Sequence, residues 1–342
     1  MSREMVVDAK TVLLCLTDDK GRQGWGEASV APLMTGESLD SLVGSIKYLV
    51  ENSLSVDWRE PTEFATIFNR ILYANASAKS CLEMALLDLY TQEKSVPLWR
   101  YLRNESGVVV DDAPAAIPLL RMLGGSFEKE LSDAKSFRAL GFRHWKIKIG
   151  SLSLDEDLHR VKVLCDALEG DVISVDANCA LSLSDALRFC QSESASKLSF
   201  AEQLIPADLA MTDFVLLKKN SPITIGLDES VHGLAELEQL IEADVLGGAS
   251  LKLIKTGGVL QALECAKLLE KHKLALNLAC KIAETSLSAA ATASLGFAMG
   301  KVTWGFSMSN QYLKFDICDT PLTAKQGCFE VSQLAASGIG VT

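Results

Sequence analysis

Five charged residues stand at the ends of short apolar segments between residues 148 and 252. They are Lys148, Asp176, Glu202, Asp228 and Lys252, and each follows the previous one after 24 to 28 residues. That interval fits one strand plus one helix, so each residue would end a different strand of one sheet. A single charge at a strand end is usually solvated. Five converging charges are costly to bury unless they neutralise one another around a ligand.

Three carboxylates between two lysines suit a divalent cation. Carboxylate oxygens from Asp176, Glu202 and Asp228 would favour a hard cation, Mg²⁺ above all, with positions left open for a substrate carboxylate. In a barrel of eight strands, Lys148 and Lys252 would face each other across the mouth. This arrangement predicts proton abstraction next to a carboxylate through a metal-stabilised enediolate. One base on each face would then invert the stereocentre.

Lys146 lies two residues before Lys148 and would point to the same side of its strand. A neighbouring cation and a bound metal both lower the pKa of a lysine. We therefore expect a lysine base that works near neutral pH, with Lys146 assisting Lys148.

Short apolar segments alternate with amphipathic helical patterns from about residue 113 onward. The candidate strands are AAIPLL, HWKIKIG, VISVDAN, LSFAEQL, ITIGLDES, ASLKLIK, LALNLAC and VTWGF. Strict alternation predicts parallel strands, and eight of them in about 200 residues predict a (β/α)8-type barrel with its chemistry at the carboxyl ends. A doubly wound sheet is the alternative, but GGS at 124–126 lacks the spacing of a phosphate loop.

The first third of the chain has a different pattern. Residues 5–30 predict antiparallel strands around a turn at DKGRQ, and residues 38–105 predict helices. We therefore expect an α+β domain over residues 1–112 and a barrel over residues 113–320. Residues 321–342 are expected to return to the first domain.

Composition excludes several classes of protein. The chain has 342 residues and a formal net charge of −11, which argues against nucleic acid or an anionic membrane as a partner. No apolar run approaches the roughly 20 residues that span a bilayer. Nine cysteines without paired spacing and a start without a signal-peptide pattern predict a cytoplasmic protein with reduced thiols. The four histidines show no ligand spacing, so zinc is not expected.

Taken together, the strand-end motifs resemble those of the enolase superfamily, in its muconate-lactonizing-enzyme subgroup. The motifs are KIKIG (146–150), VDAN (175–178), AEQL (201–204), LDES (227–230) and KLIKTGG (252–258). The resemblance covers nearly the whole chain and implies a modified TIM barrel, (β/α)7β, with an α+β capping domain. It also implies that Lys148 and Lys252 are the acid/base pair. Asp176, Glu202 and Asp228 would hold one Mg²⁺ per subunit, with Mn²⁺ as a substitute.

The same resemblance implies supporting roles for other residues of these motifs. Lys146 would contact the substrate beside Lys148. Asn178, Glu229 and Lys255 would lie behind the metal ligands and the bases and orient them.

Within the subgroup, two segments resemble dipeptide epimerases. They are GWGEASVAPLMTGES (24–38) and ANASAKSCLEMALLDL (75–90). The implied reaction epimerises an L,L-dipeptide at its C-terminal residue, with L-Ala-D/L-Glu as the prototype. Such enzymes hold the ammonium group with an Asp-x-Asp near the last strand, whereas this chain has FDICDTPL (315–322). Asp316 or Asp319 would take that role, and the spacing to the following proline favours Asp319.

Two features depart from the family pattern. The family begins with another strand and a loop that closes over the substrate, whereas this chain starts about 20–25 residues later. Either the sequence is truncated or the site is open, and an open site would admit water. On the expected seventh strand, NLACKIAETS (277–286) resembles the family's Gly-Ser/Cys-Met-x-Glu stretch. Lys281 replaces an apolar residue there, one residue is inserted, and Glu284 is expected to match the family glutamate and face the substrate.

Three functions remain open on these residues. The first is a dipeptide epimerase, possible as a homo-oligomer. The second uses the same site for o-succinylbenzoate synthesis, N-acylamino acid racemisation or muconate cycloisomerisation. The third is a truncated, non-catalytic relative, which the five intact charged residues oppose. A mandelate-racemase type is disfavoured because no histidine lies at a matching strand end.

Overall fold

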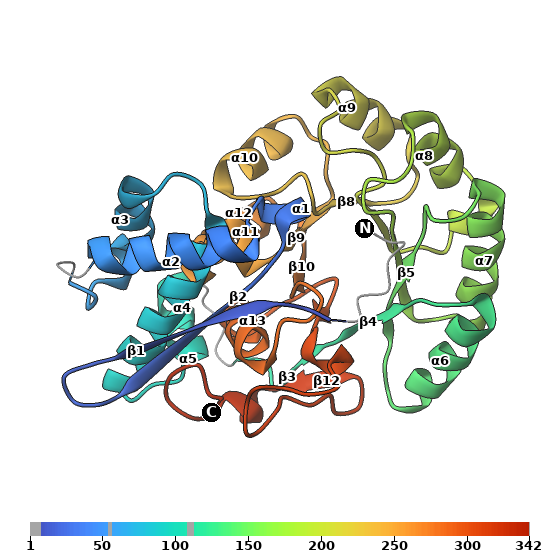
Figure 1. Cartoon of the computed structure of the whole chain (residues 1–342). Coiled ribbons are helices and arrows are strands. Elements are labelled where there is room, and N and C mark those ends of the chain that lie inside the picture. Colours follow the sequence, from blue (N-terminus) through green and yellow to red (C-terminus); the bar gives the residue numbers. More distant parts are fainter. Residues whose placement is uncertain (1–7, 54–56, 108–112, 342) are drawn as a thin grey trace.

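The computed structural model describes residues 8–53, 57–107 and 113–341. It contains a parallel eight-stranded sheet that curves into a nearly closed barrel (Figure 1), in the order β11-β10-β9-β8-β7-β6-β5-β4. The strands are β4 (Leu120–Leu123), β5 (His144–Lys148), β6 (Val172–Asp176), β7 (Phe200–Glu202), β8 (Ile225–Leu227), β9 (Gly248–Leu251), β10 (Ala275–Ala279) and β11 (Phe306–Ser307). A parallel bridge between Leu119 and Phe306 joins the two edges. The barrel of eight parallel strands predicted from the sequence, in the (β/α)7β form that the family resemblance implied, is confirmed.

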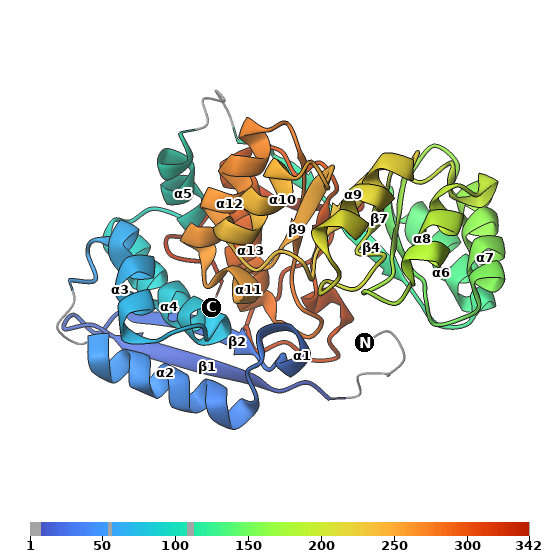
Figure 2. The same ribbon diagram turned by 90° about the horizontal axis from the view of Figure 1, so that it is seen from above.

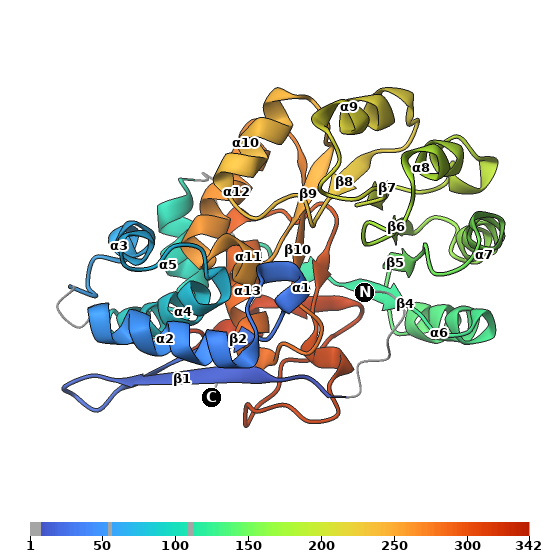
Figure 3. The ribbon, with the colours of Figure 1, turned by 45° about the horizontal axis from the view of Figure 1, so that its top comes forward.

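Seven helices follow the first seven strands and cover the outside of the barrel (Figure 3). They are α6 (Phe127–Ala139), α7 (Leu154–Ala167), α8 (Leu183–Cys190), α9 (Met211–Asn220), α10 (Leu234–Glu242), α12 (Val259–Lys271) and α13 (Ser286–Met299). A short helix, α11 (Leu253–Thr256), follows β9 directly. Every residue of α13 is buried, because this alanine-rich helix lies between the barrel and the capping domain. Among the described residues, no helix combines the length and apolarity that crossing a membrane requires.

Two predicted strands are wrong in their bounds. The AAIPLL segment divides into β3 (Ala116–Pro118), which pairs antiparallel with β12 (Cys328–Glu330), and the barrel strand β4. The division falls at Leu119, whose N–H donates to the Gly327 carbonyl instead of to a barrel strand.

The last predicted strand, VTWGF, is reduced to β11, because Trp304 turns into the barrel. Its ring stacks on Phe200 with the ring centroids 3.8 Å apart. A β-carbon at Gly226 would lie 2.8 Å from the Trp304 ring, so a glycine is required there.

The capping domain contains the predicted antiparallel pair, β1 (Thr11–Thr17) and β2 (Gln23–Ser29). Its helices are α1 (Pro32–Thr35), α2 (Leu39–Ser53), α3 (Phe64–Ile71), α4 (Ala76–Glu93) and α5 (Leu98–Ser106). Figure 2 shows this domain on one side of the molecule, with α6, α7 and α8 at the far side. β2 lies directly on α4, since a β-carbon at Gly26 would be 1.9 Å from the Cys81 carbonyl oxygen.

The C-terminal segment runs back beneath the capping helices. Pro97 and Gly338 form a bridge, and the N–H of Ile339 donates to the Asp88 carboxylate at 2.9 Å. The predicted limits of the three segments stay predictions. The boundary at residue 112 and the start of the first predicted strand, residues 5–7, lie outside the described residues.

Candidate active site

Five successive strands, β5 to β9, end in the charged residues that the sequence singled out. In the strand register, Lys148 pairs with Asp176, and Asp176 pairs with Glu202. Asp228 comes one residue after β8, and Lys252 comes one residue after β9. Because neighbouring parallel strands lie about 4.8 Å apart, this register gathers the five side chains at one end of the barrel.

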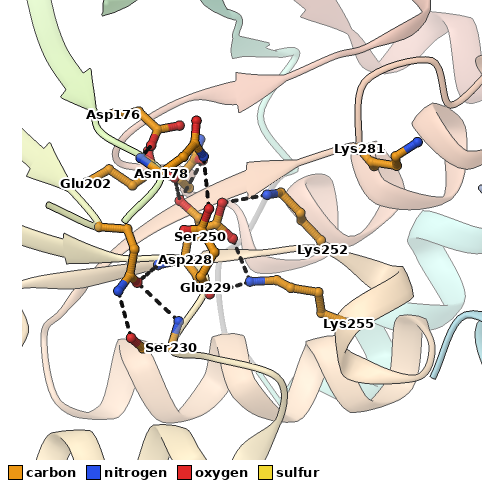
Figure 4. Close-up of polar contacts among 12 residues, drawn as sticks. Asp176, Asn178, Glu202, Asp228, Glu229, Ser230, Ser250, Lys252, Lys255 and Lys281 are labelled. Carbon is orange, nitrogen blue, oxygen red and sulfur yellow. Dashed lines mark hydrogen bonds and ion pairs between the residues drawn. The ribbon is translucent and has the colours of Figure 1, made fainter. Parts of the chain in front are cut away.

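Ion pairs connect the carboxylates to lysines. Nζ of Lys148 donates to Oδ2 of Asp176 at 2.5 Å and to Oδ1 of Asn178 at 2.7 Å. Lys252 and Lys255 both donate to the Asp228 carboxylate, as Figure 4 shows.

Lys146 pairs in the same way with Glu202. Lys255 also donates to the main-chain carbonyl of Asp228. The two lysines expected to assist therefore each hold one carboxylate in place.

Burial strengthens these charge interactions. Asp176 and Asp228 are each 2% exposed and Glu202 is fully buried. Burial opposes ionisation of Asp176, yet the ammonium groups of Lys148 and Lys146 lower its pKa. Burial also opposes ionisation of Asp228, and Lys252 and Lys255 hold its pKa well below the usual range. For Glu202, burial dominates and raises the pKa.

Carboxylates raise the pKa of two lysines at the mouth. Burial disfavours the charged form of Lys252, but Asp228 and Glu229 raise its pKa overall. Burial likewise opposes the charge of Lys146, and Glu202 with Asp176 raises its pKa. The expected lowering, which depends on a bound metal as well as a neighbouring cation, stays a prediction.

Asn178 and Glu229 form a bridge behind the carboxylates. Nδ2 of Asn178 donates to Oε1 of Glu229 at 2.9 Å. Burial and the charge of Asp228 raise the pKa of Glu229. Together with Lys255, these residues contact the cluster. Their supporting role stays a prediction.

Gln203 is a site residue that the sequence reasoning missed. Its Oε1 accepts the main-chain N–H groups of Asp228 and Ser230 at 3.0 and 3.1 Å. Its backbone φ is +37°, and φ at Asn178 is +43°, so two strand-end loops adopt the left-handed region that non-glycine residues rarely enter. The only sequence signal is a glutamine directly after the buried Glu202.

Ser250 was missed as well. Its hydroxyl lies 2.9 Å from Oε1 of Glu202 and 2.9 Å from Oδ1 of Asn277, and it can donate to one of them at a time. Both Ser250 and Asn277 are fully buried. They carry the hydrogen-bond network from Glu202 to β10.

A buried charge cluster supports β5 from outside the barrel. Arg160 on α7 donates to the Lys148 carbonyl oxygen and pairs with Asp157 and Glu130. Oδ2 of Asp157 accepts the Gly150 N–H at 2.6 Å. These contacts fix the end of β5, and they were not anticipated because Arg160 and Asp157 read as the polar face of an ordinary helix.

The far half of the mouth, after β10, is organised differently. Oε2 of Glu284 accepts the main-chain N–H of Lys281 at 2.7 Å. Glu284 is buried, and burial together with the charge of Glu27 raises its pKa to about 8. In Figure 4 Lys281 lies apart from the ion-pair cluster, and within the described residues its ammonium forms no ion pair.

The two acids after β11 do not join the cluster. Asp316 accepts the N–H and the hydroxyl of Ser286 at 3.1 and 2.6 Å and the N–H of Cys318 at 3.2 Å. Its carboxylate is therefore engaged at the first turn of α13. Asp319 is exposed and has no hydrogen-bond partner in the described part of the chain.

The donor set of the mouth fits a hard divalent cation in its chemistry. Within residues 8–53, 57–107 and 113–341, no three Asp, Glu, His or Cys side chains lie close enough to hold a metal ion, because lysines pair with the carboxylates. The three candidate ligands are nevertheless all buried carboxylates on consecutive strands. Within the described residues, Oε2 of Glu202 contacts only the ammonium of Lys146, and a carboxylate oxygen has further lone pairs that can bind a cation.

Comparison with known families identifies the group to which this arrangement belongs. The model described as enolase C-terminal domain-like matches residues 129–342. The chain belongs to the enolase superfamily. The N-terminal domain model of mandelate racemase and muconate lactonizing enzyme matches residues 1–102. The resemblance inferred from the strand-end motifs is thereby confirmed.

Individual relatives include several epimerases. A hydrophobic dipeptide epimerase of Citrifermentans bemidjiense is 28% identical over 98% of this chain and 90% of its own length. An o-succinylbenzoate synthase of Bacillus subtilis is 26% identical over 99% of this chain and 89% of its own.

Solved structures share the fold. A muconate cycloisomerase from Pseudomonas fluorescens superposes with a TM-score of 0.90 at 25% identity, over 98% of this chain and 92% of that one. A dipeptide epimerase from Cytophaga hutchinsonii, complexed with Mg and the dipeptide D-Ala-L-Val, gives 0.87 at 23% identity, over 97% and 88%.

These matches confirm that the chain is an enzyme of the isomerase class. The predicted homo-oligomer and the predicted cytoplasmic location stay predictions.

Proposed function

We propose that this protein is a Mg²⁺-dependent dipeptide epimerase that inverts the α-carbon of the C-terminal residue. The observation that carries the proposal is the order of side chains around the barrel. Lys148 on β5 and Lys252 after β9 flank three carboxylates that come from the strands between them. The epimerases among the relatives support this choice of reaction.

In the proposed mechanism, the two lysines exchange one proton with opposite faces of the α-carbon. Lys148 would remove the proton from one face, and Lys252 would deliver one to the other, which inverts the centre. The side chain of Lys148 is 25% exposed and that of Lys252 is 11% exposed, so both can reach a ligand at the mouth.

The remaining cluster residues would position this pair. Lys146 would hold Glu202, and Lys255 would hold Asp228, so that the carboxylates keep one orientation while the substrate binds. A Mg²⁺ held by Asp176, Glu202 and Asp228 would supply positive charge that stabilises the deprotonated α-carbon and offsets the carboxylate charge that raises the pKa of Lys252.

Substrate selection would depend on the far half of the mouth. Asp319 is proposed to take the ammonium group of the dipeptide, because it is exposed and has no partner in the described residues. Glu284 and Lys281 would face the rest of the substrate after β10.

One observation favours a second candidate, which is an enzyme acting on N-succinylamino acids or forming o-succinylbenzoate. The Asp316 carboxylate is engaged by Ser286 and Cys318, so less negative charge is available for an ammonium group than an Asp-x-Asp would offer. An N-acylated substrate does not need that charge. The o-succinylbenzoate synthase among the relatives is consistent with this alternative.

Deuterium exchange separates these functions. The protein would be incubated in D₂O with Mg²⁺ and a library of L,L-dipeptides, and uptake at the C-terminal α-carbon would be followed by NMR and mass spectrometry. We expect uptake that stops when EDTA removes the metal. Uptake only from N-succinylamino acids would favour the second candidate. Inactivity towards both substrate classes would favour a non-catalytic relative.

A further inference from the structure

A groove lies between the capping domain and the barrel, on the side of β8 and β9. Its volume is about 640 Å³, which is within the usual range for a site that binds a small molecule. Figure 2 shows α4 close to α11, the two elements that border it. Its walls include Met34, Phe68, Tyr73, Lys79, His232 and Lys255. None of the five strand-end residues lines it, although Lys255, the partner of Asp228, does. The groove therefore borders the cluster at Lys255 but does not include the proposed bases or metal ligands.

Lys79 is the unusual residue of this groove. It is only 6% exposed, and Nζ donates to the neutral side chain of Asn69 at 2.7 Å. In the described part of the chain, no carboxylate lies within ion-pair distance of this ammonium. A buried ammonium without a counter-charge is unfavourable.

The nearest acid does not compensate for this charge. Glu37 acts on Lys79 only through space. Its two oxygens accept the main-chain N–H groups of Ser77 and Ala78 at 2.9 and 3.0 Å, at the first turn of α4. An anionic molecule bound in the groove could therefore supply the counter-charge that the ammonium of Lys79 lacks.

We propose that the groove is a second binding site, for a small organic acid with an apolar body. The carboxylate would pair with Lys79, and the apolar part would lie against Phe68 and Met34 in the wall. Lys255 also lines the groove, but its ammonium is paired with Asp228. Lys79 is therefore the buried lysine of this wall that has no carboxylate partner in the described residues, and it matches one negative charge. A phosphate dianion would bring a second charge without a partner, and Glu236 in the same wall would repel it more strongly than it repels a monoanion.

Matched probes test this site. Calorimetry would compare 4-phenylbutyrate with its uncharged amide on the Mg²⁺-loaded protein. We expect the acid to bind at least tenfold more tightly than the amide. Lys79→Met should remove that difference, and Lys47→Met, at an exposed lysine of α2, should not change it. Equal affinities of acid and amide would overturn the proposal, as would an unchanged preference in Lys79→Met.

Two further measurements place the probe. The acid could instead bind at the barrel mouth, where Lys252→Met would abolish binding and Lys79→Met would leave it intact; that result would also overturn the proposal. Crystals of the wild-type protein soaked with 4-bromophenylacetate should show the bromine in the groove. This readout needs no variant and does not depend on the proposed epimerase activity.

Discussion

Two sets of buried carboxylates occur in this protein, and they have different partners. At the barrel mouth, Asp176, Glu202 and Asp228 pair with lysines. At the joint between the capping domain and the barrel, Glu27 and Glu83 accept main-chain N–H groups from the first turns of α13 and α12. Both sets are almost completely buried.

The difference in partners indicates a difference in role. Main-chain N–H groups at a helix N-terminus are fixed donors, so a carboxyl group bound to them keeps its partners permanently. Lysine side chains can move or lose a proton, so a carboxylate paired with lysine can exchange that partner for a metal or a substrate. Variants in the mouth should therefore affect chemistry first, and variants in the joint should affect stability first.

The largest effect is expected at the mouth. Lys252→Met should lower the rate of α-deuterium exchange by about a thousandfold or more, because one of the two bases is lost. Asp228 keeps its ion pair with Lys255 in this variant, so thermal unfolding should change little. Lys267→Met, at a half-exposed lysine on the outer helix α12, provides the control. Exchange within tenfold of the wild type would contradict the two-base scheme.

At the joint between the capping domain and the barrel, the expected effect is smaller and concerns stability instead of activity. Glu27 accepts the N–H and hydroxyl of Thr285 and the N–H of Ser288. Glu27→Gln would place an amide NH₂ against these donors and should lower the free energy of unfolding by about 2–4 kcal/mol in urea titrations. The exposed Glu264→Gln should have no measurable effect. If Glu27→Gln leaves the free energy of unfolding unchanged, the carboxylates at the joint do not have the stabilising role that sets them apart from those at the mouth.

Asp316 and Asp319 lie in one loop and test the same contrast between a carboxylate that stabilises the fold and one that acts on the substrate. Asp316→Asn should lower the free energy of unfolding by about 1 kcal/mol, since its carboxylate caps α13 through Ser286. Its effect on the KM for a dipeptide should be small. Asp319→Asn should do the reverse, with a raised KM and unchanged unfolding. If Asp316→Asn raises the KM and leaves stability intact, the assignment of the two acids is inverted.

The last expected effect is a pH dependence of stability. Burial raises the pKa of Glu83 from 4.5 to about 8. Between these values the unfolded chain has released its proton and the folded protein retains it, so Glu83 makes stability fall as pH rises. Glu83→Gln should reduce the loss of unfolding free energy between pH 5 and pH 8 by at least about 1 kcal/mol. An identical pH profile for both proteins would show that Glu83 ionises normally.

Much of the barrel could be predicted because its repeat is local. Each strand is a short apolar run, each helix has its own periodicity, and the charged residue follows the run directly, as in Val175-Asp176 and Ala201-Glu202. The split between β3 and β4 could not be predicted, because it depends on the Leu119 N–H and the distant Gly327 carbonyl. The short β11 likewise depends on Trp304 packing against Phe200, a contact between segments far apart in the chain.

The sequence by itself determined which side chains meet at the mouth, since parallel strands in register must bring their ends together. Only the tertiary structure decided which partner each buried carboxylate has. Glu27 and Thr285 are 258 positions apart, and no local pattern connects them. The same holds for Lys79, whose unpaired charge becomes visible only when the capping helices close over it. The free energy needed to keep a charged side chain depends on its burial and on its long-range contacts, and both exist only in the folded chain.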